Sequence, residues 1–230
     1  MTPGKLVGGA LLAVLALQFL PAIAATAGLS GQWELRYDSR SVPPASLTAS
    51  ARQAAAQHRA ADLEGLRWCR IAGLPLLMEG PLDIQQGRIE IAIVAPLSSV
   101  ARHIYTDGRA QVSLQDFEAT TNGNSVGHWE GATLVVDTIG FSERGMVSIP
   151  GGGFRSGRSH LTERYRLSDD GQQLLVSFSW TDPGVYARPH SYEFRYFRAP
   201  ASRNVIEWPC EPFAPDRARF FAPAMAGRGK

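Results

Sequence analysis

Three residues in the middle of the chain have the side chains of an acid–base site: His128, Glu130 and Asp137. His128 and Glu130 are two positions apart, so on a β-strand their side chains point to the same face. Imidazole titrates near neutral pH and a nearby carboxylate raises its pKa, which suits proton transfer. We therefore take these three residues as candidate catalytic residues. The alternative is that the His128–Glu130 pair lies on the solvated face of its strand.

The stretch that carries these residues is expected to be a β-hairpin. Residues 125–130 form one strand, Gly131 and Ala132 the turn, and residues 133–139 a second strand rich in β-branched side chains. Trp129 points away from the face of His128. We expect it to be mostly buried, like Trp33, because aromatic rings dominate core burial.

Asp137 stands in an apolar strand, where a buried carboxylate needs hydrogen-bond partners. Arg109, Arg164 or the backbone amides of a turn are candidate partners. A structural ion pair is an interpretation at least as good as catalysis.

A second set of residues is expected at strand ends, where side chains could bind a ligand. Asp107-Gly108 predicts a tight hairpin turn, and an arginine beside it could bind a ligand carboxylate. Between residues 158 and 167 the side chains alternate, with His160, Thr162 and Arg164 on one face. That face is either solvated or part of a site. The candidate ligand-binding residues are Tyr105, Asp107, Arg109, His160, Arg164, Tyr186 and Arg188.

The strand pattern predicts a mainly β fold, namely a single antiparallel β-barrel-like domain of lipocalin or calycin type with one N-terminal surface helix. Short strands joined by short turns follow one another from residue 82 onwards, with a last strand near residues 205–208. Ser46 is expected to cap the helix, which runs to about residue 63. Gly31-Gln32-Trp33 resembles the opening of lipocalin-like barrels.

Residues 1–27 have the pattern of a signal peptide: Lys5, then an apolar run, then a cleavage site at Ala22-Ile23-Ala24 or Ala25-Thr26-Ala27. The apolar run is shorter than the roughly 20 residues of a membrane span, although an uncleaved anchor is the alternative. We expect a β-rich domain over residues 28–215, a flexible tail over residues 216–230, and a periplasmic or secreted location.

Composition limits the classes of partner that the sequence leads us to expect. The 230 residues carry a formal charge of +2, which gives no reason to expect nucleic-acid binding. The two cysteines, Cys69 and Cys210, are expected to form a disulfide in an exported protein. We expect no cofactor and no metal, although a metal held by His and carboxylate ligands stays possible.

Several motifs together resemble a large, uncharacterised family of exported bacterial proteins. The resemblance covers roughly residues 69–211 and implies one module, without implying an activity. It departs at residues 155–157, Arg-Ser-Gly, where many relatives carry His-Ser/Thr-Glu. The motifs are Tyr105-Thr106-Asp107-Gly108-Arg109, Gly127-His128-Trp129-Glu130-Gly131, residues 134–141 (LVVDTIGF), and Asp182-Pro183 with Tyr186 and Arg188-Pro189.

The function that the sequence favours is binding of a small, partly apolar molecule by an exported β-barrel. The first alternative is an enzyme, a lyase, isomerase or hydrolase that uses His128 with Glu130 or Asp137. The second is an envelope interaction module, which would need an exposed apolar patch or sheet edge. No HExxH, Walker or Rossmann motif is present.

Overall fold

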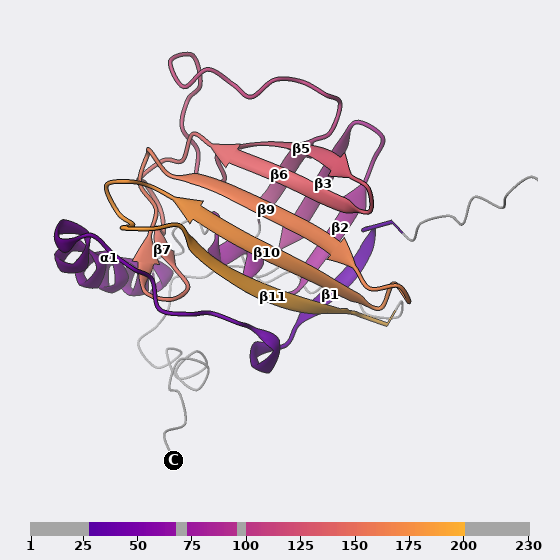
Figure 1. The fold of residues 1–230 in the computed structure, drawn as a ribbon, viewed down its shortest axis with the longest axis horizontal. Coiled ribbons are helices and arrows are strands. Elements are labelled where there is room, and N and C mark those ends of the chain that lie inside the picture. The colour runs from indigo at the N-terminus through magenta and orange to yellow at the C-terminus, as the bar shows by residue number, and fades with distance from the viewer. Residues whose placement is uncertain (1–27, 68–72, 96–99, 201–230) are drawn as a thin grey trace, which may run out of the picture.

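Nine strands close into a barrel in a computed structural model that describes residues 28–67, 73–95 and 100–200. The strands follow the order β1-β11-β10-β9-β6-β5-β4-β3-β2, and β1 pairs with β2 to close the circle (Figure 1). This confirms the predicted fold class of a mainly β, single-barrel domain. The barrel strands are β1 (Gly31–Leu35), β2 (Leu82–Gln86), β3 (Glu90–Ala95), β4 (Val100–Tyr105), β5 (Asn124–Glu130), β6 (Thr133–Ile139), β9 (His160–Leu167), β10 (Gln173–Thr181) and β11 (His190–Arg198).

One neighbouring pair of strands departs from the predicted antiparallel order. β4 and β5 run parallel, with Ile104 opposite Ser125 and Tyr105 opposite Val126. The connection between them, residues 106–123, is long enough to return to the end of the barrel where β4 began, as a parallel pair requires. The hairpin of β5 and β6 forms as predicted, with register pairs from Asn124–Ile139 to Glu130–Thr133.

Strict alternation along the strands separates the inner from the outer face. On β9 the side chains of Leu161, Glu163 and Tyr165 are fully buried, while Thr162 and Arg164 are not, as the alternating pattern predicted. Large aromatic side chains fill the barrel between β10 and β11: Phe178 stacks on Tyr192 with ring centroids 4.7 Å apart. Such rings bury large apolar areas, which is the main favourable term in folding.

Trp33 and Trp129 differ in burial, although both were expected in the core. Trp33 is completely buried, and its indole N–H donates to the carbonyl of Leu29 over 2.9 Å. The expectation for Trp129 is wrong, since 43% of this residue is exposed. Trp129 follows the inner-face alternation of Ser125 and Gly127. However, it lies one residue from the end of β5, where the strand reaches the end of the barrel.

The α-helix of the described region, α1 (Ala49–Arg67), lies outside the barrel next to the short hairpin of β7 (Ser148–Ile149) and β8 (Gly153–Phe154). It begins and ends later than predicted. Its cap is Thr48 rather than Ser46, because the Thr48 hydroxyl accepts the Ala51 N–H over 3.2 Å. Buried Asp62 fixes the helix by accepting the backbone N–H groups of Val147 and Ser148.

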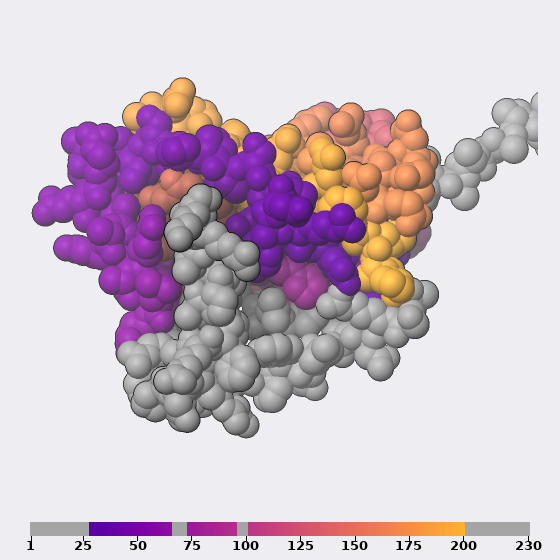
Figure 2. Space-filling view, turned by 90° about the horizontal axis from the view of Figure 1, so that it is seen from below, coloured from indigo at the N-terminus to yellow at the C-terminus, as the bar shows by residue number. Residues whose placement is uncertain are grey.

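The segment between β1 and α1 runs along the barrel. After the 3-10 turn η1 (Tyr37–Ser39), Ser41 pairs with Glu193 of β11 and Leu47 with Tyr186. Figure 2 shows this indigo segment crossing the face seen from below, between α1 and the C-terminal strands. A second 3-10 turn, η2 (Leu76–Met78), precedes β2.

In the described residues, no helix has the length and apolar character needed to cross a bilayer. The predicted signal peptide, last strand and tail, with Cys69 and Cys210, lie outside the described residues.

Candidate functional site

The candidate residues His128, Glu130, Asp137, His160 and Arg164 all lie on the outer face of β5, β6 and β9. The inner positions of the same strands are taken by apolar or buried polar side chains, such as those at positions 134, 136 and 138. Because side chains alternate, the intervening residues must point outward. Any chemistry by these residues would therefore occur on the barrel wall.

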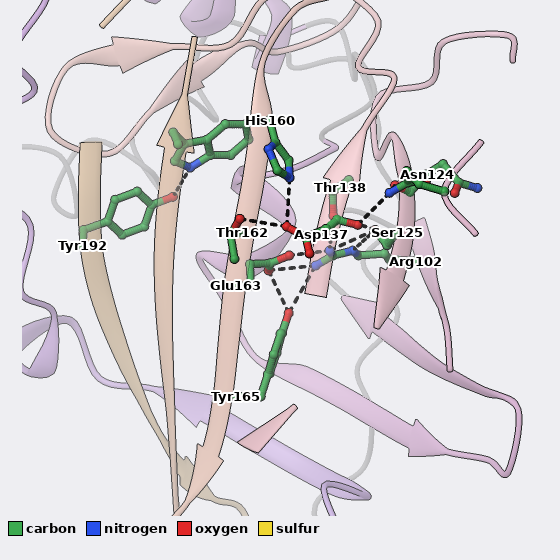
Figure 3. A network of polar contacts seen from close by, with 12 residues as sticks. Arg102, Asn124, Ser125, Asp137, Thr138, His160, Thr162, Glu163, Tyr165 and Tyr192 are labelled. Atoms are coloured by element: carbon green, nitrogen blue, oxygen red, sulfur yellow. Dashed lines mark hydrogen bonds and ion pairs between the residues drawn. The ribbon is translucent and has the colours of Figure 1, made fainter. Parts of the chain in front are cut away.

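Asp137 and His160, two of the candidate residues, are in direct contact. Asp137 Oδ1 lies 2.9 Å from His160 Nε2 and accepts the Thr162 hydroxyl over 2.9 Å (Figure 3). The register of β6 and β9 produces this contact, because Asp137 is directly opposite Thr162. The predicted partners were wrong: His160 and Thr162 occupy this carboxylate, not Arg109 or Arg164. The side chains of His160 and Asp137 are 43% and 41% exposed, which leaves them accessible to a ligand.

His128, Glu130 and Arg164 form a separate chain of contacts on the same face. His128 Nε2 lies 3.3 Å from Glu130 Oε1, and Arg164 Nη2 donates to Glu130 Oε2 over 2.7 Å. These hydrogen bonds, from Arg164 first and His128 second, lower the pKa of the Glu130 carboxyl. His128 ends in this exposed contact with Glu130, and none of its contacts in the described part of the chain reaches the Asp137–His160 pair.

Tyr105, Asp107 and Arg109 satisfy one another in the turn after β4. Arg109 donates to both Asp107 oxygens, at 2.9 Å from Nε to Oδ1 and 2.7 Å from Nη2 to Oδ2. This bonding lowers the pKa of the Asp107 carboxyl. The Arg109 guanidinium carbon also lies 3.8 Å from the centre of the Tyr105 ring. The three residues stabilise a turn, but the predicted hairpin at this turn is wrong, because the next strand, β5, begins only at Asn124 and runs parallel to β4.

Tyr186 and Arg188 lie in the loop between β10 and β11 but in different environments. Tyr186 is buried, donates its hydroxyl to the Phe154 carbonyl over 2.8 Å and stacks on His190. Burial raises the pKa of this phenol. Its contacts are those of a packing residue. Arg188 is exposed.

A groove of about 350 Å³ lies next to the Asp137–His160 pair, on the outer face of β9, β10 and β11. Its floor consists of two rows of register partners. Arg164, Ser177 and Glu193 form one row, and Thr162, Ser179 and Ser191 form the other. Ser41 and Pro43 line it from the segment that runs beside β11.

The groove exists because short hydroxyl side chains occupy positions where an outer barrel face usually carries long ones. Two hydrogen bonds order the hydroxyls: Ser177 donates to Glu193 Oε1 over 2.9 Å, and Ser191 donates to Ser179 over 3.2 Å. Thr162 both lines the groove and bonds Asp137, so it connects the groove to His160. The sequence analysis missed the serines, although their alternation with Phe178 and Trp180 was a usable signal.

Inside the barrel a second polar cluster surrounds Arg102, which the sequence analysis also missed. Arg102 is 1% exposed and donates to both Glu163 oxygens, and to Tyr165, Ser125 and Thr138 (Figure 3). Burial by itself lowers the pKa of the guanidinium, but Glu163 and Tyr165 reverse the effect and the pKa is raised. Arg102 alternates with His103 and shares the face of Ile104, a pattern that would have placed it inside.

Ser125 also belongs to the run Gly123-Asn124-Ser125-Val126-Gly127, which has the spacing of a hydrolase nucleophile motif. The structure places this serine inside the barrel on β5, 2% exposed and bonded to Arg102 and Thr138. A nucleophile elbow requires an exposed serine on a strand-to-helix turn. The motif is therefore structural here.

No protein-family model matches the chain, and comparison with curated proteins gives no significant match. Within the described residues, no three His, Cys, Asp or Glu side chains are grouped so that they could hold a metal ion.

Proposed function

We propose that this protein is an exported barrel that binds a small, hydrogen-bonding molecule in the groove on the outer face of β9, β10 and β11. The observation that carries the proposal is the groove itself, a hollow of about 350 Å³ lined by hydroxyl groups. That volume is at the lower end of the range for small-molecule sites. The Pro43 ring offers an apolar contact, which fits a ligand with one apolar edge.

The outer face is favoured over the barrel interior because large side chains fill the interior positions. Trp33, Trp180 and Tyr196 are among the completely buried residues that point inward. The interior charges of Arg102 and Glu163 already satisfy each other. Hydroxyls on the outer wall, by contrast, are partly solvated and ready to exchange water for a ligand.

A substitution that fills the groove tests this proposal. Mixtures of small polar metabolites should shift the amide signals of β9, β10 and β11 in nuclear magnetic resonance spectra of the native protein. Ser179→Leu places a large side chain in the floor and should abolish those shifts. The matched control is Gln173→Leu on the same strand and face, outside the groove. Equal binding by both variants would place the ligand elsewhere.

Export is the second part of the proposal, and it is supported by the composition of residues 1–27. Expression of the full chain in a bacterial host should give a periplasmic product that lacks this segment. The intact mass of the product measures this directly. A product that retains Met1 to Ala27 and stays in the cytoplasm would contradict export.

Acid–base catalysis is a second candidate function, favoured by the 2.9 Å contact between Asp137 and His160. In this reading Asp137 orients the imidazole and stabilises its cationic form, while His160 exchanges a proton with a molecule in the neighbouring groove. His160→Gln should then abolish turnover of a groove ligand and leave its Kd almost unchanged. The control is His103→Gln, an exposed histidine on β4. Full turnover by His160→Gln would exclude this role.

A further inference from the structure

Two opposite charges lie in the groove, one on each side of Ser177. Arg164 of β9 and Glu193 of β11 are both register partners of Ser177, and both line the groove. The structure has no ion pair between them. Arg164 instead contacts Glu130 outside the groove, and Glu193 accepts from Ser177.

Each charged group retains donors or acceptor positions that these contacts do not use. Arg164 uses Nη2 for Glu130, and a guanidinium has five N–H donors, so one edge can still take a carboxylate in a bidentate manner. Ser177 occupies Glu193 Oε1, and a carboxylate has about four acceptor positions. Glu193 can therefore accept an ammonium group without losing its bond to Ser177.

The spacing of the two charges limits the size of a molecule that bridges them. Arg164 and Glu193 are two strands apart, so their Cα atoms are separated by about 10 Å. One or two residues of extended chain span at most about 3.5 or 7 Å. With a hydrogen bond of about 2.8 Å at each end, the ligand and its two hydrogen bonds together span about 9 to 13 Å. The long side chains of Arg164 and Glu193 can match this span.

We propose that the groove binds an amino-acid or dipeptide zwitterion, with its carboxylate at Arg164 and its ammonium group at Glu193. The inference rests on the proposed binding function and names its ligand class. Ser177 lies between the two charges, and Thr162 and Ser179 lie in the neighbouring row; their hydroxyls can bond the peptide group of a dipeptide. A neutral polyol would satisfy those hydroxyls but would leave the remaining donors of Arg164 and the remaining acceptor positions of Glu193 without an oppositely charged ligand group.

Calorimetric titration of the full chain with alanyl-alanine, N-acetyl-alanyl-alanine and alanyl-alanine amide tests the inference; free alanine tests the shorter ligand. Blocking either charge should weaken binding at least tenfold. In Arg164→Gln, alanyl-alanine and its amide should bind equally, because the side chain that distinguishes them is gone. In Glu193→Gln, alanyl-alanine and its N-acetyl form should bind equally. Arg166→Gln and Arg195→Gln, on the same strands and face, are the matched controls.

The possible outcomes distinguish an error in the ligand class from an error in the position of the binding site. If a neutral polyol binds and Ser179→Leu blocks it, while no zwitterion binds, the groove stands and the ligand class is wrong. Zwitterion binding that Ser179→Leu does not affect overturns the inference, as do equal affinities of wild-type protein for free and blocked peptides. This last comparison needs no variant, so it holds even where a substitution prevents folding.

Discussion

Arg102 and Glu163 form an ion pair inside the barrel, with Arg102 Nη1 2.9 Å from Glu163 Oε1 and both side chains almost without exposure. They come from β4 and β9, strands that are not neighbours in the sheet. Ser125, Thr138 and Tyr165 complete the hydrogen bonding. The attraction within such a pair must offset the cost of removing two charges from water, so an intact pair adds little net stability.

Removing one member of this pair should be far more harmful than removing both. Glu163→Leu or Arg102→Met leaves an uncompensated charged group in the interior and should cost about 3–5 kcal/mol of unfolding free energy. The double variant Arg102→Met/Glu163→Leu should recover most of that loss. Urea denaturation of the three variants measures the coupling. Additive losses would show that the two charges do not act as a pair.

The two tryptophans discussed above should differ strongly in their contribution to stability. Trp33→Ala removes a fully buried indole and should cost about 3–5 kcal/mol. Trp129→Ala removes a side chain that is 43% exposed at the barrel end and should cost less than about 1 kcal/mol. Chemical denaturation of both variants under one set of conditions compares them. A loss above about 3 kcal/mol for Trp129→Ala would reveal burial that the structure does not show.

Local alternation made the strands and their faces predictable, but it did not predict which residues of other strands each side chain contacts. Residues 160–167 could be divided into Leu161, Glu163 and Tyr165 on one face and Thr162 and Arg164 on the other, because the period of a strand is two residues. Which partner each residue meets depends on register between distant strands. Asp137 meets His160 only because β6 pairs with β9 beyond the excursion of β7 and β8.

The groove was beyond sequence reasoning for the same physical reason. Serine on an outer strand face usually means a solvated surface, and three strands must align their short side chains before a hollow appears. Its wall comes from Ser41 and Pro43, about 150 residues before β11 in the chain. No local pattern in residues 41–43 indicates that pairing.

The free energy of unfolding should fall as the pH drops through 6.5, the ordinary histidine pKa, because His190 is buried in its neutral form. Burial lowers its pKa below 6.5, while its contact with the Pro150 carbonyl opposes part of the shift. The groups that face its ring are Tyr186 and Tyr192, and neither supplies a counter-charge. The unfolded chain therefore binds the proton more tightly than the folded protein does.

The loss should begin near pH 6.5 and end at the lowered folded-state pKa, with a slope of at most about 1.4 kcal/mol per pH unit for this one proton. Urea denaturation of wild-type protein and His190→Gln at pH 7.5, 6.5, 5.5 and 4.5 measures it. The variant should be less stable at pH 7.5 but should lose less stability towards acid. Parallel curves for the two proteins would exclude His190 as the source.

The last prediction is a disulfide between Cys69 and Cys210, the two cysteines of the chain. Both lie outside the described residues, and the proposed export would place them in an oxidising compartment, where disulfides form and persist. Residues 69 and 210 flank nearly all the barrel strands. Closing so long a loop should stabilise the fold by about 4–5 kcal/mol in the chain-entropy model, less any strain in the native state.

Intact-mass measurement of periplasmic protein, alkylated after denaturation with and without prior reduction, decides the point. We expect no alkylation without reductant and two additions after reduction. Two buried thiols, the alternative, would both react once the protein is denatured without reductant. Cys69→Ser/Cys210→Ser should then denature at the same urea concentration as the wild type. If the bond exists, the double variant should unfold at a lower urea concentration than the wild type. Reductant should then shift the wild-type midpoint towards that of the variant.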